Sequence, residues 1–395
     1  MAFLLIAGIY WAVAIRKILV HSQAVDFQTV YAGANTIRHG GNPYLHAVLG
    51  TTHDPPAYLL SFAALTLLPQ PQAKILWDCI NAASLFLAVW LLCEVTPYRW
   101  QFAPVILLFP PVLSNFDLGQ LKLELLCLLI LTIRWTERRR EGLAGAALAL
   151  ASLWRIFPIV LLGYFVVRRN RRMLAWSIGW LCAGTLVTIA LAGWTTCVDF
   201  LTVLHDFGER GILRNENDFS IAAVIVRTTG SKLIALPVMV MILAGTVAAS
   251  FGKEHHWRIF SLWVVTALLL LPVLWPYDLV FLLIPLVSMT AAPVAAGALF
   301  LIAASYMFAS APTWLYLFGK AILGARLSAF LYPFAVHSQW LSAVSGYAAA
   351  LLALREAPHT EADEQSAPVL DTGGSGRLMG SHRNPATAAT NAETR

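Results

Sequence analysis

Long apolar runs separated by short polar stretches cover the chain from its amino terminus to residue 354. A helix that crosses a bilayer needs about 20 mostly apolar residues, and fewer where neighbouring helices shelter it. The pattern therefore predicts an all-α polytopic membrane protein with about ten transmembrane helices. We expect these helices near residues 2–20, 72–95, 101–114, 120–135, 173–193, 231–250, 258–275, 278–290, 292–310 and 335–354.

Two further apolar segments do not fit a simple span. Residues 55–71 are bracketed by prolines and are too short to cross comfortably, so we predict an interfacial or shallow re-entrant helix there. Residues 142–167 are long enough to cross once at about 1.5 Å per residue. Basic clusters flank that second segment at residues 134–140 and 168–172.

These two basic clusters decide how residues 142–167 are interpreted. Arginine-rich segments beside spans remain in the cytoplasm, so both clusters are expected on that side. The segment between them must then enter the membrane, break and return, and Pro158 marks the break because proline interrupts a helix. Arg155 would lie at the tip, inside the membrane. A single crossing, which would place the second cluster outside, is the alternative.

The first polar stretch, residues 21–55, sets the orientation of the outer face. It carries Arg38 against Asp26 and Asp54, so we expect it outside the cell membrane. Counting spans forward places residues 115–120, 194–230, 275–278 and 311–334 on the same side as loops. Residues 1–354 would form the membrane domain. Residues 355–395 are rich in Ala, Thr, Gly and charge without apolar periodicity, which predicts a disordered cytoplasmic tail.

Composition excludes several classes of protein. The 395 residues are 58% hydrophobic and 12% charged, with a mean hydropathy of +0.69, well outside the range of soluble globular domains. The net charge of +6 lies mainly beside apolar segments, so it indicates topology and not a nucleic-acid partner. No histidine pair has the spacing of a known zinc motif, and no glycine pair resembles a nucleotide-phosphate loop. We expect no metal and no other cofactor.

Polar residues gather on the predicted outer face. They are amides, aromatic rings and carboxylates, a combination typical of sugar binding: Asp26, Tyr31, Asn42, Tyr44, Asn115, Asp117, Gln120, Arg214, Asn215, Asn217, Asp218, Trp275, Tyr277 and Asp278. Arg155 beneath them is costly inside a membrane unless it meets an anion, and a phosphate is the anion we expect. From position alone, Asn115 and Gln120 could instead cap helix ends, and Asp278 could be a cap or a ligand.

Five pieces of sequence carry a resemblance to a known family. They are "DFQTVYAGANTIRHGGNPY", "HDPPAYLLSFAALTLLP", "NFDLGQLKLELLCLLIL", "LWRIFPIVLLGYFVVRRNRR" and "PVLWPYDLVFLLIPL". In this order they resemble glycosyltransferase family 87, membrane-embedded class C glycosyltransferases that use polyprenyl-phosphate sugars. The family includes mycobacterial mannosyltransferases of phosphatidylinositol mannoside synthesis. Arg155 stands where many relatives have lysine, and Pro276 to Asp278 stand where many have histidine.

The resemblance implies a class C glycosyltransferase fold and a hexosyltransferase, by its family a mannosyltransferase. Sugar would move from a polyprenyl-phosphate donor to a lipid or glycan acceptor with inversion, Asp26 acting as the base. Arg155 would bind the donor phosphate. We expect the sugar or the acceptor to contact seven more residues: Tyr31, Asn42, Tyr44, Asp54, Gln120, Tyr277 and Asp278. The alternative is a transporter or lipid flippase, because broken helices and membrane-buried charge fit that class too.

Overall fold

Helices make up the regular structure of the described part of the chain. The computed structural model describes residues 7–13, 15–16, 24–45, 52–97, 99–209, 218–253, 255–290 and 294–355. No β-strand occurs among these residues, which confirms the predicted all-α class. The predicted disordered tail lies outside the described residues, apart from Arg355, which ends the last helix.

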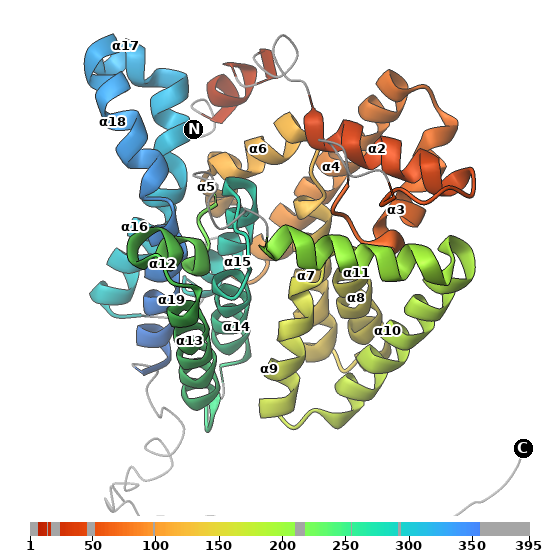
Figure 1. Ribbon diagram of the computed structural model, residues 1–395. Coiled ribbons are helices and arrows are strands. Elements are labelled where there is room, and N and C mark those ends of the chain that lie inside the picture. Colours follow the sequence, from red (N-terminus) through yellow and green to blue (C-terminus); the bar gives the residue numbers. More distant parts are fainter. Residues whose placement is uncertain are drawn as a thin grey trace, which may run out of the picture. The chain divides into compact units, whose positions relative to one another are not determined.

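The first half of the chain alternates short and long helices (Figure 1). Its elements are α2 (Val25–Arg38), α3 (Pro56–Phe62), the 3-10 helix η1 (Ala63–Leu67), α4 (Gln70–Cys93), η2 (Arg99–Phe102), α5 (Ala103–Leu107), α6 (Pro110–Leu118), α7 (Lys122–Glu137), α8 (Glu141–Trp154), η3 (Phe157–Leu161), α9 (Leu162–Val167), α10 (Arg171–Ala192) and α11 (Trp194–Glu209).

The second half is helical in the same way. Its elements are α12 (Ile221–Thr229), η5 (Lys232–Ile234), α13 (Ala235–Ser250), α14 (His256–Leu269), η6 (Pro276–Leu282), α15 (Leu283–Ser288), α16 (Ala296–Trp314), the π-helical turn η7 (Leu315–Gly319), α17 (Lys320–Leu323), α18 (Ala325–His337) and α19 (Trp340–Arg355).

Four helical stretches of the described chain are long and apolar enough to cross a bilayer. They are Gln70–Cys93, Arg171–Ala192, Lys232–Ser250 and Ala296–Leu323. A fifth is added if the pair Trp100–Leu107 and Pro110–Leu118, bent by 55°, is counted as one broken span. The other apolar helices are shorter, among them Glu141–Trp154 and His256–Leu269. The structure therefore supports a membrane protein, and the total of about ten spans stays a prediction.

Three stretches predicted as outer loops are helical in the structure, which corrects the sequence analysis. α2 lies in the first of them, α11 and α12 in the second, and α17 and α18 in the third. The prediction was wrong because it relied on apolar content alone. α2 buries Phe27, Val30, Ala34 and Ile37, which are spaced as one helical face, although polar residues fill the rest of the segment.

The predicted break in residues 142–167 is present. α8 ends at Trp154, and Arg155 has an extended backbone (φ −149°, ψ 137°) before η3 and α9. Arg139 before α8 and Arg168 to Arg172 after α9 line one cavity, so the chain returns to the side from which it came. This reversal is what the re-entrant interpretation requires. α10 packs along α8, and Gly145 allows this because a Cβ there would lie 2.7 Å from Trp176 Cβ.

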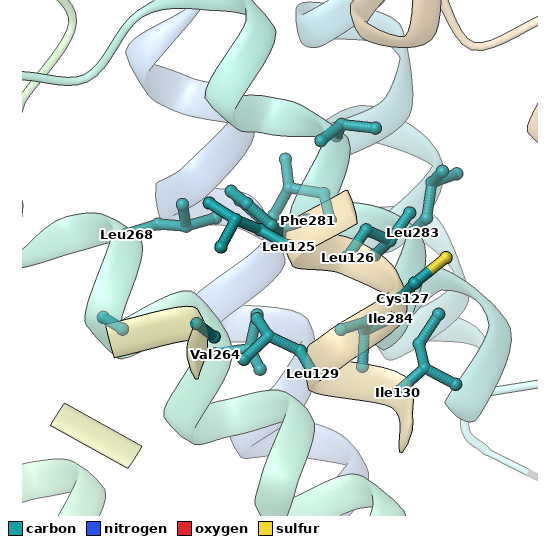
Figure 2. Close-up of a cluster of buried hydrophobic side chains, with 14 of the residues drawn as sticks. Leu125, Leu126, Cys127, Leu129, Ile130, Val264, Leu268, Phe281, Leu283 and Ile284 are labelled. Carbon is teal, nitrogen blue, oxygen red and sulfur yellow. The ribbon is translucent and has the colours of Figure 1, made fainter. Parts of the chain in front are cut away.

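A buried cluster of aliphatic and aromatic side chains joins α7 to α14, η6 and α15 (Figure 2). Leu125 and Leu129 of α7 point towards Val264 and Leu268 of α14 and towards Phe281 of η6. Since lipid tails are as apolar as leucine, close packing and not exclusion from water holds such a cluster together within a membrane. It fixes the start of α7 and the start of η6 next to each other.

Candidate active site

One cavity of about 630 Å³ collects most of the predicted site residues. Its walls come from α2, the start of α3, the turn between α6 and α7, the break after α8, one face of α11, and the chain from α14 to η6. Its carboxylate, basic and amide side chains are Asp26, His53, Asp54, Gln120, Lys122, Arg155 and Asp278. Segments more than 250 residues apart in the sequence therefore contribute to a single polar site.

Asp26 lies in the first turn of α2, and Gln120 Nε2 donates a hydrogen bond to its Oδ2. Gly119 makes this pair possible because it ends α6 in the left-handed conformation (φ 72°), and a Cβ there would lie 2.6 Å from Phe27 Cβ. Burial raises the pKa of the Asp26 carboxyl, and the charge of Asp54 raises it further. The hydrogen bond from Gln120 and the charge of Arg155 oppose that rise.

Arg155 and Asp54 form an ion pair, with Nη2 and Oδ1 2.6 Å apart. Arg155 follows the last residue of α8, where the negative end of the helix dipole favours a cation. Thr52 Oγ1 donates to the second oxygen of Asp54 at 2.8 Å and so fixes the carboxylate. Because only one donor of the guanidinium is used by this pair, other donors remain to bind a second anion.

Lys122 and Asp278 form a second ion pair, with Nζ and Oδ1 2.7 Å apart. Both side chains are buried, with 6% and 3% of their surface exposed. Asp278 Oδ2 also accepts a hydrogen bond from the Trp275 backbone at 3.0 Å, so it caps η6 as well. Lys122 is the first residue of α7, where the helix dipole disfavours a cation, and Asp278 offsets that cost.

Two aromatic rings lie beside this second ion pair. Trp275 and Tyr277 stack with their centroids 6.3 Å apart, and Lys122 Nζ lies 5.4 Å from the centre of the Tyr277 ring. Both residues line the cavity. Aromatic faces next to carboxylates and amides form a surface that accepts the apolar face of a sugar ring and its hydroxyls together.

The remainder of the cavity wall is apolar. Most of it is formed by side chains from the break after α8, from α11 and from the end of α14: Ile156, Phe157, Ile159, Val160, Phe200, Leu204, Ala267, Leu270 and Leu271. α11 turns away from α10 and lies across the bundle in Figure 1. The cavity thus combines a charged part with an apolar part in a continuous space.

The three predicted residues Tyr31, Asn42 and Tyr44 do not line the cavity. The Tyr31 hydroxyl donates to the Leu68 carbonyl at 2.7 Å, so it ties α2 to the segment after η1. Asn42 Nδ2 donates to Asp199 Oδ2 of α11 at 2.7 Å, and the Tyr44 hydroxyl donates to the Asp54 carbonyl at 2.6 Å. Their described contacts support the walls of the cavity.

The other outer polar residues are also placed by the structure. Asn115 is buried and donates to the carbonyls of Pro111 and Tyr277, while Asp117 is exposed outside the cavity wall. Asp218 accepts hydrogen bonds from the backbones of Ser220 and Leu274. Arg214, Asn215 and Asn217 lie outside the described residues.

Sequence reasoning missed Lys122, the second cation of the cavity. The signal was present, since a lysine opens the apolar run "KLELLCLLIL". It was passed over because nothing in the sequence places Lys122 next to Asp278, 156 positions later. Among the described residues, no group of three or more His, Cys, Asp or Glu side chains is arranged to hold a metal ion.

The three carboxylates of the cavity are not equivalent. Asp54 and Asp278 each pair with a cation, whereas Asp26 has an amide as its partner and no ion pair with a described residue. The ion pairs already engage the carboxylates of Asp54 and Asp278, so their oxygens are less available to take a proton from a substrate hydroxyl. Asp26 is therefore the carboxylate of this cavity best suited to accept a proton.

Comparison with known proteins connects this geometry to a family. A polyprenol-phosphate-mannose-dependent alpha-(1-2)-phosphatidylinositol pentamannoside mannosyltransferase of Mycobacterium tuberculosis is 26% identical over 280 residues, 65% of this chain and 64% of that protein. An alpha-(1-2)-phosphatidylinositol mannoside mannosyltransferase of the same species, also polyprenol-phosphate-mannose-dependent, is 26% identical over 202 residues, 44% of this chain and 46% of that protein. The chain thus spans less than two thirds of the length of either relative.

The model of glycosyltransferase family 87 matches residues 53–275. This match contains Asp54, Gln120, Lys122 and Arg155 of the cavity, while Asp26 lies before it and folds back onto it through Gln120. Since the match covers more than half of the 395 residues, the chain belongs to glycosyltransferase family 87.

Proposed function

We propose that the protein is an integral membrane mannosyltransferase that moves a mannosyl group from a polyprenyl-phosphate donor to a lipid or glycan acceptor. Membership of the family, and the donors and acceptors in the names of its relatives, support the class of reaction. The single observation that carries the assignment of the site is the cavity that Asp26, a carboxylate with no ion pair to a described residue, shares with two cations.

Asp26 is proposed as the general base. A sugar hydroxyl is a weak nucleophile, so a carboxylate within hydrogen-bond reach takes its proton while the oxygen attacks the anomeric carbon. The new bond forms as the bond from that carbon to the phosphate oxygen breaks, and the electron pair leaves with the phosphate. A single base and one direct displacement invert the anomeric centre. Gln120 holds Asp26 for this step.

Arg155 and Lys122 are proposed to bind the donor phosphate. The leaving phosphate gains negative charge in the transition state, and fixed cations in a water-poor cavity stabilise it. Asp54 and Asp278 hold these cations in place before the donor arrives. Asp54, predicted to contact sugar, thus has a second proposed role as the partner of Arg155. Tyr277 and Trp275 are proposed to contact the sugar. The apolar wall of the cavity is proposed to contact the isoprenoid chain of the donor.

The proposed donor requires a particular location of the site. We propose that the protein lies in the cell membrane with the cavity open to the extracytoplasmic side and both arginine clusters inside. The reversal of the chain at Arg155 supports this layout, because it places the clusters together at the end of α8 away from the cavity.

Cysteine labelling tests the orientation. In a background where the five native cysteines are replaced, Asp117→Cys should react with a membrane-impermeant maleimide added to intact cells, since Asp117 is exposed near the cavity end. Arg138→Cys, at the opposite end, should react only after the cells are opened. The reverse pattern would show that the proposed orientation is inverted.

The raised pKa of Asp26 predicts the pH dependence of transfer. Only the deprotonated carboxylate acts as a base, so kcat/KM should fall as the pH drops through its pKa. Because burial raises that pKa, the fall should occur above pH of about 4, where an ordinary aspartate titrates. A profile that stays flat down to pH of about 4 would argue against Asp26 as the base.

Turnover by the purified protein tests the class of function. Wild-type protein in detergent, given polyprenyl-phosphate mannose and a membrane lipid extract, should release polyprenyl phosphate and form a mannosylated lipid in equal amounts. If it forms neither product, but moves a lipid or a solute across the membrane of reconstituted vesicles, the transporter or flippase alternative takes the place of this proposal.

A further inference from the structure

A second cavity of about 580 Å³ lies at the other end of α8 from Arg155. The 14 residues of α8 separate the two ends by roughly 20 Å at 1.5 Å per residue. The lining of this second cavity is strongly basic. Five arginines and one histidine contribute to it: Arg139, Arg168, Arg169, Arg171, Arg172 and His256. Glu141 is the one acidic residue in the wall.

Three turns of the chain converge to build this second cavity. Arg139 lies between α7 and α8, Arg168 and Arg169 lie between α9 and α10, and Lys253 precedes α14. Arg168 donates to the Lys253 carbonyl, and its Nη2 lies 3.4 Å from His256 Nε2. These contacts fix one wall, so the cavity is a built part of the fold.

Four of the lining arginines have no ion pair with a described residue. They are Arg139, Arg169, Arg171 and Arg172, and all four are exposed. The rule that places positive charge in the cytoplasm requires only that such residues be on one side of the membrane. It does not require residues from two separate turns to surround one concave space, where their charges repel each other.

The local backbone also disfavours arginine at these positions. Arg139 and Arg169 have positive φ values, 57° and 52°, a conformation usually given to glycine or asparagine. Arg171 and Arg172 form the first turn of α10, where the positive end of the helix dipole favours acidic residues. An anion in the cavity would offset the electrostatic cost of Arg171 and Arg172 at the start of α10.

We propose that this second cavity binds a phosphate group, supplied by the headgroup of an anionic phospholipid or by a free phosphate. Guanidinium groups bind phosphate with paired hydrogen bonds, and basic pockets at the cytoplasmic ends of helices bind lipid headgroups in this way. Apolar side chains are exposed close to the arginines, with Val166 58% and Trp176 52% exposed, and they provide a surface for acyl chains. This site is independent of the proposed transfer reaction.

Native mass spectrometry of the full-length protein tests the proposal. Wild-type protein should retain phosphatidylglycerol far better than phosphatidylcholine. The double variant Arg171→Gln with Arg172→Gln should bind phosphatidylglycerol roughly 30-fold more weakly, since each basic residue near an anionic lipid contributes roughly a fivefold factor. Arg326→Gln, which removes an exposed arginine of α18, serves as the matched control and should bind it normally.

Thermal unfolding in lipid-free detergent distinguishes the two sources of phosphate. If inorganic phosphate at millimolar concentration raises the Tm of the wild type and not of the double variant, the cavity takes the free ion as well. If only added phosphatidylglycerol raises the Tm of the wild type and not of the double variant, the ligand is the lipid headgroup. The double variant itself should keep the wild-type Tm without ligand, because it removes two charges that the helix dipole disfavours.

Equal retention of phosphatidylglycerol by the wild type and the double variant, together with no difference in their response to inorganic phosphate, would overturn the proposal. The arginines would then act only as topology signals. The conservative pair Arg171→Lys with Arg172→Lys preserves the charge, and should bind with an intermediate affinity because the paired hydrogen bonds are lost.

Discussion

Asp26→Asn should slow mannosyl transfer by about 10²–10⁴-fold, the range for the loss of a general base. The substitution keeps the size of the side chain, and Gln120 can rotate its amide to preserve the hydrogen bond. Donor binding should therefore persist while kcat falls. Single-turnover transfer and binding of radiolabelled polyprenyl-phosphate mannose, measured on the same purified sample, separate the two effects.

Asp117→Asn is the matched control for this substitution. Asp117 belongs to the same outer polar stretch as Gln120, but it is exposed and does not line the cavity. Its variant should transfer mannose at the wild-type rate. If Asp26→Asn is also normal while Asp278→Asn is inactive, the base has been assigned to the wrong carboxylate and the cavity keeps its role.

Arg155→Ala should lower kcat/KM by roughly 10²–10³-fold, the loss expected when one group that stabilises a transition-state charge is removed. The reason is that Arg155 is the cation at the break of the chain. Its guanidinium has N–H donors that the ion pair with Asp54 does not use, and these can bind the phosphate. Arg155→Lys should retain part of the activity, because the charge survives although the paired geometry is lost. Initial rates over a range of donor concentrations measure both variants.

Loss of stability must be separated from loss of phosphate binding in this experiment. Arg155→Ala leaves Asp54 buried without its cation, and breaking a buried ion pair costs about 3–5 kcal/mol. The double variant Arg155→Leu with Asp54→Asn removes both charges, so it should unfold at nearly the wild-type temperature and remain inactive. A double variant that regained transfer would exclude a direct role for Arg155.

Much of the cavity was predictable because its signals are local. Arg155 next to Pro158 marks a break in an apolar segment, and the two arginine clusters specify that the segment returns. Asp26 was found through its family resemblance, since an acid beyond an apolar run is otherwise an ordinary solvated residue. Neighbouring residues were enough to state the expectation for Arg155, whereas Asp26 required the ordered set of five segments that carry the family resemblance.

The parts that could not be predicted depend on contacts between distant segments. Lys122 and Asp278 neutralise each other only because α7 packs against η6 and α14, and Figure 2 shows the apolar cluster in which these elements meet. Tyr31 and Asn42 have the composition of sugar ligands, yet their hydrogen bonds go to the Leu68 carbonyl and to α11. Residue type indicates which chemistry is possible, and packing decides which residues face the cavity.

The cavity around Asp26 and Arg155 is proposed as the site of transfer. A structure of the protein with a bound, non-transferable analogue of polyprenyl-phosphate mannose tests this most directly. We predict the phosphate within hydrogen-bond distance of Arg155, the sugar between it and Asp26, and the isoprenoid chain along the apolar wall formed with α11. An analogue bound elsewhere, with this cavity unchanged and empty, would show that transfer takes place at another site.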